Sequence, residues 1–326
     1  MGKILLDAID RKILSELDKN SRIPASILAK KVKKSRESVK YRIQQLQSKG
    51  VIQKFITSID PNKLGNYMFK IYLKLENIPD EREKFFNELK RNKDVYWMGI
   101  SDGAFDIVFA ILSKNIPQGY DKINFLLSGW EHIIVARVLG TMVDTTQYHK
   151  KFFLEEKDSS PVVIAGAVVE NEVDELDMKI LRILANDARI SLTELARKVN
   201  STIEVVRGRI KSLTDKGIIL SYRISVDFNL LGMEFFKAII YFKSLSENDE
   251  KALYEWMRVH PNSLYYIRSI APWQAEFEFA VENYQHFNSI INDLRKAFPK
   301  VIRNYEHLIM IYENWMPAYS EMLKAK

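Results

Sequence analysis

The chain carries the same pattern of apolar and polar positions twice. The block from Asp7 to Gly65 reappears without a gap as Asp174 to Gly232, at a fixed offset of 167 positions. Each copy opens with four apolar residues on one helical face: Ile9, Ile13, Leu14 and Leu17 in the first, and Leu176, Ile180, Leu181 and Leu184 in the second. A repeat of this length is too long for a solenoid and corresponds to a complete set of domains. One chain therefore contains two copies of the same functional unit.

Two more helices and a β segment follow in each copy. The apolar positions of the second helix are Ile27, Leu28 and Val32, then Leu195 and Val199; those of the third are Val39, Ile43 and Leu46, then Val206, Ile210 and Leu213. Gly50 and Gly217 are expected to end the third helix as left-handed caps. β-type residues at 51–59 and 218–226 are enough for the strands of a small wing. This order predicts a winged helix-turn-helix, whose third helix lies in the major groove of DNA.

The segments after each copy predict an α/β sandwich. Phe69, Ile71, Leu73 and Leu75 alternate with Lys70, Tyr72, Lys74 and Glu76, which predicts a strand with one buried face. Further strands are expected at 95–100, 105–112 and 132–148, with helices at 81–91 and 118–127. The second unit repeats the order, with strands at 235–242, 264–270, 275–281 and 302–312 and helices at 248–259 and 285–298. Each segment is thus ferredoxin-like, βαββαβ, a fold that says nothing about function by itself.

The predicted fold class is α+β, with two winged helix-turn-helix domains alternating with two ferredoxin-like βαββαβ domains. The expected boundaries are 1–65 and 66–154 for the first unit, 155–172 for a linker, and 173–232 and 233–326 for the second unit with a C-terminal tail. The linker begins with acidic and Ser-Pro residues, and its apolar middle is expected to pack as an extra strand.

The positive charge of the chain is concentrated in the first copy. A net charge of +7 and a pI near 9.2 indicate an anionic partner without naming it. Between positions 21 and 50 the basic residues are Arg22, Lys30, Lys31, Lys33, Lys34, Arg36, Lys40, Arg42 and Lys49, against Glu37 alone. The matching segment, 188–217, is basic but more weakly so. This distribution is typical of a phosphate-binding face, although a solvated lysine-rich surface would have the same composition.

The candidate DNA contacts are the residues expected to face outward near the start of each third helix. They are Lys34, Ser35, Arg36, Lys40, Tyr41, Arg42 and Gln44 in the first copy, and Thr202, Arg207 and Lys211 in the second. Arg36 and Gln44 have the groups that read base edges. Lys34, Lys40 and Arg42 are better placed to hold phosphates. In the second copy Ile203 replaces the tip arginine, and Gly208 costs the helix on the order of 1 kcal/mol. That copy is therefore predicted to bind more weakly, to read a different half-site, or to act only as a scaffold.

These residues resemble the Lrp/AsnC (feast-famine) family of transcription regulators. The segment LDAIDRKILSELDKNSRIPASILAKKVKKSRESVKYRIQQLQSKGVIQKFITSIDPNKLG is similar to that family's DNA-binding domain along its whole length. VDELDMKILRILANDARISLTELARKV, with RGRIKSLTDKGII, is similar to it again. The resemblance implies a sequence-specific regulator of double-stranded DNA whose βαββαβ domains sense an amino acid or related small molecule. It also implies pairing of the two sheets within one chain, as a pseudo-dimer, and assembly into homo-oligomers.

The family's effector pocket includes a G-x-x-x-F/Y-D-like turn between the middle strands. The segment from Gly99 to Asp106 is similar to it, so the resemblance implies that Gly99, Asp102, Gly103 and Asp106 bind the effector. Glycines let backbone N–H groups approach a ligand carboxylate, and an acid accepts an ammonium group. The second unit reads RSIAPWQAE from Arg268 to Glu276, without either glycine, and Pro272 and Trp273 are expected to fill or reshape its pocket. The alternative is an ordinary tight turn with Asp106 as a solvated strand residue.

Other chemistry is not indicated. The chain has no cysteine, which excludes disulfides and thiolate metal sites, and its five histidines lack metal-ligand spacing. No nucleotide-binding or nucleophile motif is present, so no catalytic residue, cofactor or metal is predicted. Without a visible secretion signal or a membrane-length apolar run, a cytoplasmic protein with no membrane partner is expected.

Two other functions stay open at this point. Sirohaem decarboxylases look like this family, but they carry His-, Arg- and Asn-Trp-containing segments that are not found here. The second alternative is an architectural protein that coats DNA without recognising sequence.

Overall fold

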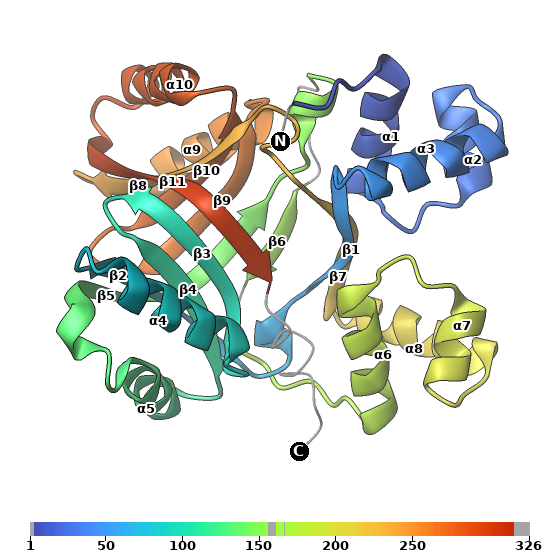
Figure 1. Ribbon diagram of the computed structural model, residues 1–326, viewed down its shortest axis with the longest axis horizontal. Coiled ribbons are helices and arrows are strands. Elements are labelled where there is room, and N and C mark those ends of the chain that lie inside the picture. Colours follow the sequence, from blue (N-terminus) through green and yellow to red (C-terminus); the bar gives the residue numbers. More distant parts are fainter. Residues whose placement is uncertain (1–2, 156–160, 166, 316–326) are drawn as a thin grey trace.

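The computed structural model describes residues 3–155, 161–165 and 167–315. A body of strands and covering helices forms one side of the molecule, and two groups of three helices lie on the other side (Figure 1). Two long strands run between the body and the helix groups.

The helix groups form as predicted. The first contains α1 (Ala8–Lys19), α2 (Ala25–Val32) and α3 (Arg36–Ser48), and the second contains α6 (Glu175–Asn186), α7 (Leu192–Lys198) and α8 (Ile203–Asp215). Asp7 caps α1 by accepting from the backbone N–H groups of Ile9 and Asp10 at 2.9 and 2.7 Å. Asp174 caps α6 in the same way, in a capping box with Asp177.

The strands expected for the two wings form, but they pair between the copies and not within each copy. β1 (Ile52–Ile59) and β7 (Ile219–Val226) pair antiparallel with each other, with Ile56 opposite Arg223. Neither segment contains the turn residues that a hairpin needs, so each strand takes its partner from the other copy. We call β1 and β7 together the shared ribbon.

The shared ribbon exchanges strands between the two helix groups. β7 packs on α1, and Ile224 and Val226 enter the core of the first group. β1 packs on α6, where Ile59 enters the second core and the Thr57 hydroxyl donates to the carbonyl of Leu184 at 2.6 Å. Each helix group therefore completes its hydrophobic core with a strand from the other unit.

Both units continue as βαββαβ. The first contains β2 (Tyr67–Leu75), α4 (Pro79–Arg91), β3 (Val95–Gly103), β4 (Ile107–Ser113), α5 (Ile116–Leu127) and β5 (Ile134–Gln147). The second contains β8 (Glu234–Phe242), α9 (Glu247–Val259), β9 (Ser263–Ile270), β10 (Ala275–Val281), α10 (Tyr284–Ala297) and β11 (Ile302–Trp315). The ferredoxin-like prediction is confirmed in both.

The two sheets close into one barrel. β5 pairs first with β2 and then with β9, whereas β11 pairs first with β8 and then with β3. Around the barrel the order is β2-β4-β3-β11-β8-β10-β9-β5, and β5 meets β2 again. β6 (Val162–Ala165) adds to β5, as expected for the apolar middle of the linker.

Closure of the barrel buries both faces of its strands. The outward face packs under α4 and α5 in one unit and under α9 and α10 in the other (Figure 1). The inward face was not expected to be buried, yet Lys70 is 5% exposed and Tyr72 is 1% exposed. Trp273 packs edge-on to Tyr72, with 4.7 Å between ring centroids, and fills the barrel as a packing residue.

Candidate nucleic-acid interface

The start of α3 presents a basic, uncovered face. Ser35 caps the helix by accepting from the N–H of Ser38 at 3.1 Å, and Lys33 makes the preceding turn with a left-handed φ of 54°. The side chains exposed on this face are those of Lys34, Ser35, Arg36, Lys40, Tyr41 and Gln44. The helix start is thus free to approach a duplex, as helix-turn-helix docking requires.

The cations of this face have no competing partner. Within the described part of the chain, the side chains of Lys34, Arg36 and Lys40 take part in no ion pair or hydrogen bond. The Tyr41 ring stands beside them and is 62% exposed. Unpaired cations around an exposed aromatic ring are suited to phosphate and base contacts.

Arg42 differs from the other candidates because it is turned toward α1. Its Nη1 lies 2.7 Å from a carboxylate oxygen of Asp7 and 2.7 Å from one of Asp10. Hydrogen bonds to these carboxylates raise the pKa of the guanidinium above its usual range. The second copy repeats the arrangement, since Arg209 pairs with Asp174 and Asp177. An ion pair kept in both copies indicates that Arg42 joins α3 to α1, and its contact with phosphate stays a prediction.

The matching face of α8 carries fewer cations. Thr202 caps this helix by accepting from the N–H of Val205 at 3.3 Å, and the exposed candidates are Thr202, Arg207 and Lys211. A side chain added at Gly208 would meet no atom within 4 Å, so the middle of this face is bare. Ile203 occupies the position of Arg36.

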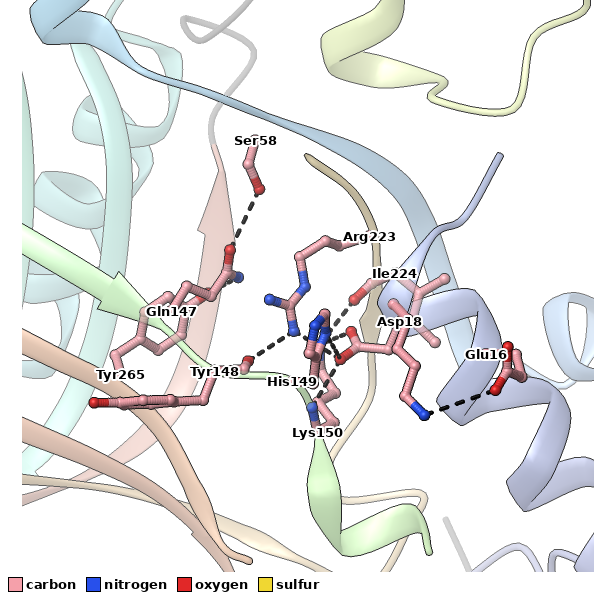
Figure 2. Close-up of polar contacts among 11 residues, drawn as sticks. Glu16, Asp18, Ser58, Gln147, Tyr148, His149, Lys150, Arg223, Ile224 and Tyr265 are labelled. Atoms are coloured by element: carbon pink, nitrogen blue, oxygen red, sulfur yellow. Dashed lines mark hydrogen bonds and ion pairs between the residues drawn. The ribbon is translucent and has the colours of Figure 1, made fainter. Parts of the chain in front are cut away.

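A buried ion cluster attaches the first helix group to the barrel and the shared ribbon. Figure 2 shows Asp18 of α1 accepting from the backbone N–H and the Nζ of Lys150 and from Nη2 of Arg223, each at 2.7 Å. Burial by itself would raise the pKa of Asp18, but Arg223 and Lys150 outweigh it and hold that pKa well below its usual range. The cluster therefore fixes where α1 sits relative to β7.

The four effector candidates lie in the second half of β3 and the turn that follows it, with different surroundings. A side chain at Gly99 would collide with Met310, and one at Gly103 would meet the carbonyl of His307 at 2.4 Å, so both glycines allow β11 to pack closely. Asp106 is buried rather than solvated: it accepts from the N–H of Leu75 at 2.8 Å and pairs with Arg82 at 3.0 Å. Asp102 is exposed and only caps its own turn. Effector binding by these residues stays a prediction.

The inward residues of the barrel escaped sequence reasoning. Lys70 and Lys237 hold equivalent positions and both contact Glu276, with Nζ to carboxylate distances of 3.0 and 2.5 Å. The sequence did contain a signal for these buried charges. A lysine recurs at the same position of two otherwise apolar strands, and a third strand carries the alternating acids Glu276 and Glu278. Only closure of the barrel explains why these charges are buried.

The chain is similar to known DNA-binding proteins. A family model described as winged helix-turn-helix DNA-binding matches residues 6–53 and 173–219. An uncharacterized HTH-type transcriptional regulator of Pyrococcus abyssi is 32% identical over 153 residues, which are 45% of this chain and 95% of the relative. The HTH-type transcriptional regulator LrpB of Bacillus subtilis is 28% identical over 125 residues, 38% of this chain and 83% of LrpB. The chain belongs to the Lrp/AsnC family.

This Lrp/AsnC protein is a DNA-binding transcription regulator that contains the family's unit twice. The solved siroheme decarboxylase NirDL is similar over 98% of this chain and 97% of its own, with a TM-score of 0.64 and 12% identity, which shows a shared fold alone. No helix among the described residues is long and apolar enough to cross a membrane. No cluster of three metal-ligating side chains occurs in the same part of the regulator.

Proposed function

We propose that this regulator reads an imperfect palindrome through two unequal helices, with α3 providing most of the affinity. The observation that carries the proposal is the difference between the two exposed faces. At the start of α3 the side chains of Lys34, Arg36 and Lys40 are free within the described residues, whereas the face of α8 offers Arg207 and Lys211 around Gly208, which has no side chain. Each phosphate contact releases counterions, so the helix with more free cations contributes more to affinity.

Binding-site selection from random duplexes tests whether a sequence is recognised. We expect a recovered motif with two related but unequal half-sites. Failure to enrich any motif would instead indicate an architectural protein that coats DNA.

Charge-neutralised variants test which helix dominates. The triple variant Lys34→Gln, Arg36→Gln and Lys40→Gln should bind DNA much more weakly. The slope of its affinity against salt concentration should flatten by about 0.9 log units per lost phosphate contact. Glutamine at Arg207 and Lys211 is the matched change on α8 and should have the smaller effect. Arg42→Gln is measured separately: a flatter salt slope would support its predicted phosphate contact, whereas reduced stability with an unchanged slope would assign Arg42 to its ion pairs with α1. Equal losses from the α3 and α8 variants would contradict the assignment.

An amino-acid effector at the turn near Asp102 is proposed as a separate function. Asp102 is the candidate there whose side chain is exposed and bonded only within its own turn. A screen of amino acids for altered DNA affinity, repeated with Asp102→Ala, tests this. The variant should lose the response and keep basal DNA binding.

We infer that the chain acts as a regulator in the cytoplasm and not as a decarboxylase. The regulator function is supported by the relatives named above, and NirDL shares only the fold. Addition of an iron-uroporphyrin analogue, the ligand of a solved NirDL complex, should leave the absorbance of the analogue unchanged. A saturable change in that spectrum would support the enzyme function instead.

A further inference from the structure

A cavity lies where the shared ribbon meets the end of the barrel. Its volume is about 90 Å³, and Ile56, Trp97, Met142 and Ile267 supply part of its largely apolar wall. A neighbouring cavity of about 280 Å³ shares several lining residues with it, namely Ile56, Gln147, Tyr265 and Glu313. For scale, an engineered cavity of about 150 Å³ holds benzene. The first cavity, which has the more apolar wall, therefore fits a small ligand of a few carbon atoms.

The barrel interior holds one carboxyl group more than its lysines neutralise. Lys70 and Lys237 both pair with Glu276, and Lys237 also pairs with Glu278 at 2.6 Å. The third carboxyl, Glu313, lines the cavity and accepts a hydrogen bond from the Trp97 indole N–H at 2.9 Å. Within the described residues Glu313 makes no ion pair. Glu313 is half-buried, and a carboxylate withdrawn from water in this way without a counter-charge is unfavourable.

The ionisation of Glu313 reflects this imbalance. Burial, with the neighbouring Glu278, raises the pKa of Glu313 to about 7. A cation placed beside the carboxyl would favour its ionised form.

A second polar group in the cavity also lacks a partner. Thr145 is 5% exposed and lines the cavity, and its hydroxyl makes no hydrogen bond among the described residues. Thr145 on β5 and Glu313 on β11 hold equivalent positions in the two units. A buried hydroxyl left unbonded is costly, so the site is suited to a ligand that donates to it.

The difference between the two units explains why this space is open. In the first helix group the junction with the ribbon is filled by Asp18 and Arg223 (Figure 2). Their equivalents in the other unit are Ala185 and Ile56, and both line the cavity. Two short or apolar side chains replace an ion pair, which leaves room for a ligand.

We propose that this cavity binds a small primary amine, with the ammonium group between Glu313 and Thr145 and the apolar chain along Ile56 and Met142. An ammonium has three donors, which match a carboxylate and an unbonded hydroxyl. Among the residues that line the first cavity the cation is Lys70, and it is already paired with Glu276, so that cavity offers no free cation to a ligand carboxylate. The site thus selects amines over amino acids, and it is distinct from the turn at Asp102.

The probe that tests this is n-butylamine, with butyrate and 1-butanol as matched controls. The readout is the indole N–H signal of Trp97 in a ¹H–¹⁵N spectrum, because that N–H donates to Glu313. The Trp273 indole serves as an internal reference, since Trp273 does not line the cavity. We expect a saturable shift of the Trp97 signal with n-butylamine and none with butyrate.

Conservative variants link the binding to the named groups. Glu313→Gln keeps an acceptor for Trp97 but removes the charge, and it should weaken n-butylamine binding by about tenfold or more. Thr145→Val keeps the shape and should weaken it by a few-fold. Asp102→Asn should bind n-butylamine like the wild type, which separates this site from the proposed effector turn. The proposal is overturned if the Trp97 signal does not saturate, if butyrate or 1-butanol binds equally well, or if Glu313→Gln binds as tightly as the wild type.

Discussion

Arg22 and Arg189 hold equivalent positions in the two copies, and each donates from Nη1 to the main-chain carbonyl of the residue that precedes the other. Each guanidinium also lies over an aromatic ring of the shared ribbon, Arg22 over Tyr222 at 5.4 Å and Arg189 over Phe55 at 5.3 Å. The rings are equivalent as well, so the contact is reciprocal in every part. It joins the two helix groups through both copies at once.

Loosening this contact should weaken binding to a full operator. In the double variant Arg22→Gln with Arg189→Gln, the two helix groups lose this connection, so the second half-site binds at a lower effective concentration. Affinity for a duplex with both half-sites should fall by about tenfold or more. Affinity for a duplex with one half-site should stay unchanged, as measured by fluorescence anisotropy. Equal losses on both duplexes would mean that the arginines contact DNA directly.

The buried cluster around Asp18 should be a major determinant of stability. Asp18→Asn would leave Arg223, which is 1% exposed on its side chain, without a carboxylate partner. The free energy of unfolding should fall by about 3 kcal/mol, as for other buried ion pairs that lose one member. Glu16→Gln, which breaks a more exposed pair with Lys31, is the control and should cost less than about 1 kcal/mol. Similar denaturation midpoints for the two variants would show that the cluster contributes little.

Two half-buried histidines should destabilise the protein in mild acid. Burial lowers the pKa of His149 and of His260 from an ordinary 6.5 to about 4. The unfolded chain therefore binds more protons between these values, and the contribution to stability is complete above pH 6.5 and is lost as the pH falls toward 4. Each histidine should contribute on the order of 1–3 kcal/mol.

The variants His149→Asn and His260→Asn isolate this effect. Glu313 acts in the opposite sense, because its pKa is raised to about 7 and its contribution is lost as the pH rises through that value. The free energy of unfolding is measured in urea at pH 5 and pH 7.5 for the wild type and for each variant. Glu313 contributes equally to both proteins, so its contribution cancels when the variant is subtracted from the wild type. The gain in free energy of unfolding from pH 5 to pH 7.5 should be smaller in each variant than in the wild type. Parallel curves for wild type and variants would contradict the assignment.

Local sequence signals were sufficient for the helices and for the order of strands. Asp7, Asp174, Ser35 and Thr202 cap the predicted helices. The apolar spacing identified most of the residues that fill both helix cores, but Ile27 is 48% exposed. These signals succeed because a helix start and an apolar helix face depend on residues only a few positions apart.

Long-range pairing could not be predicted in the same way. The residues of β1 do not indicate whether its partner strand is local or belongs to the other copy. In the structure β1 pairs with β7 of the other copy. Alternation in β2 predicted one buried face, yet Lys70 and Tyr72 lie inside a barrel that β5 and β11 close. The site residues on α3 were predictable because they follow the helix period. The engagement of Arg42 and Asp106 with other side chains depends on tertiary contacts that periodicity does not contain.

Gly208 provides a test of how closely α8 approaches DNA. A side chain here meets no atom within 4 Å, and glycine inside an exposed helix is less favourable than alanine, so Gly208→Ala should stabilise the protein by about 1 kcal/mol. The equivalent position on α3 holds Tyr41, which is 62% exposed, so the fold itself accepts a side chain there. If α8 contributes little to affinity, binding to the full operator should change by less than about twofold, or 0.4 kcal/mol. A marked loss of affinity in this more stable variant would instead mean that the glycine lets the α8 backbone lie directly against the duplex.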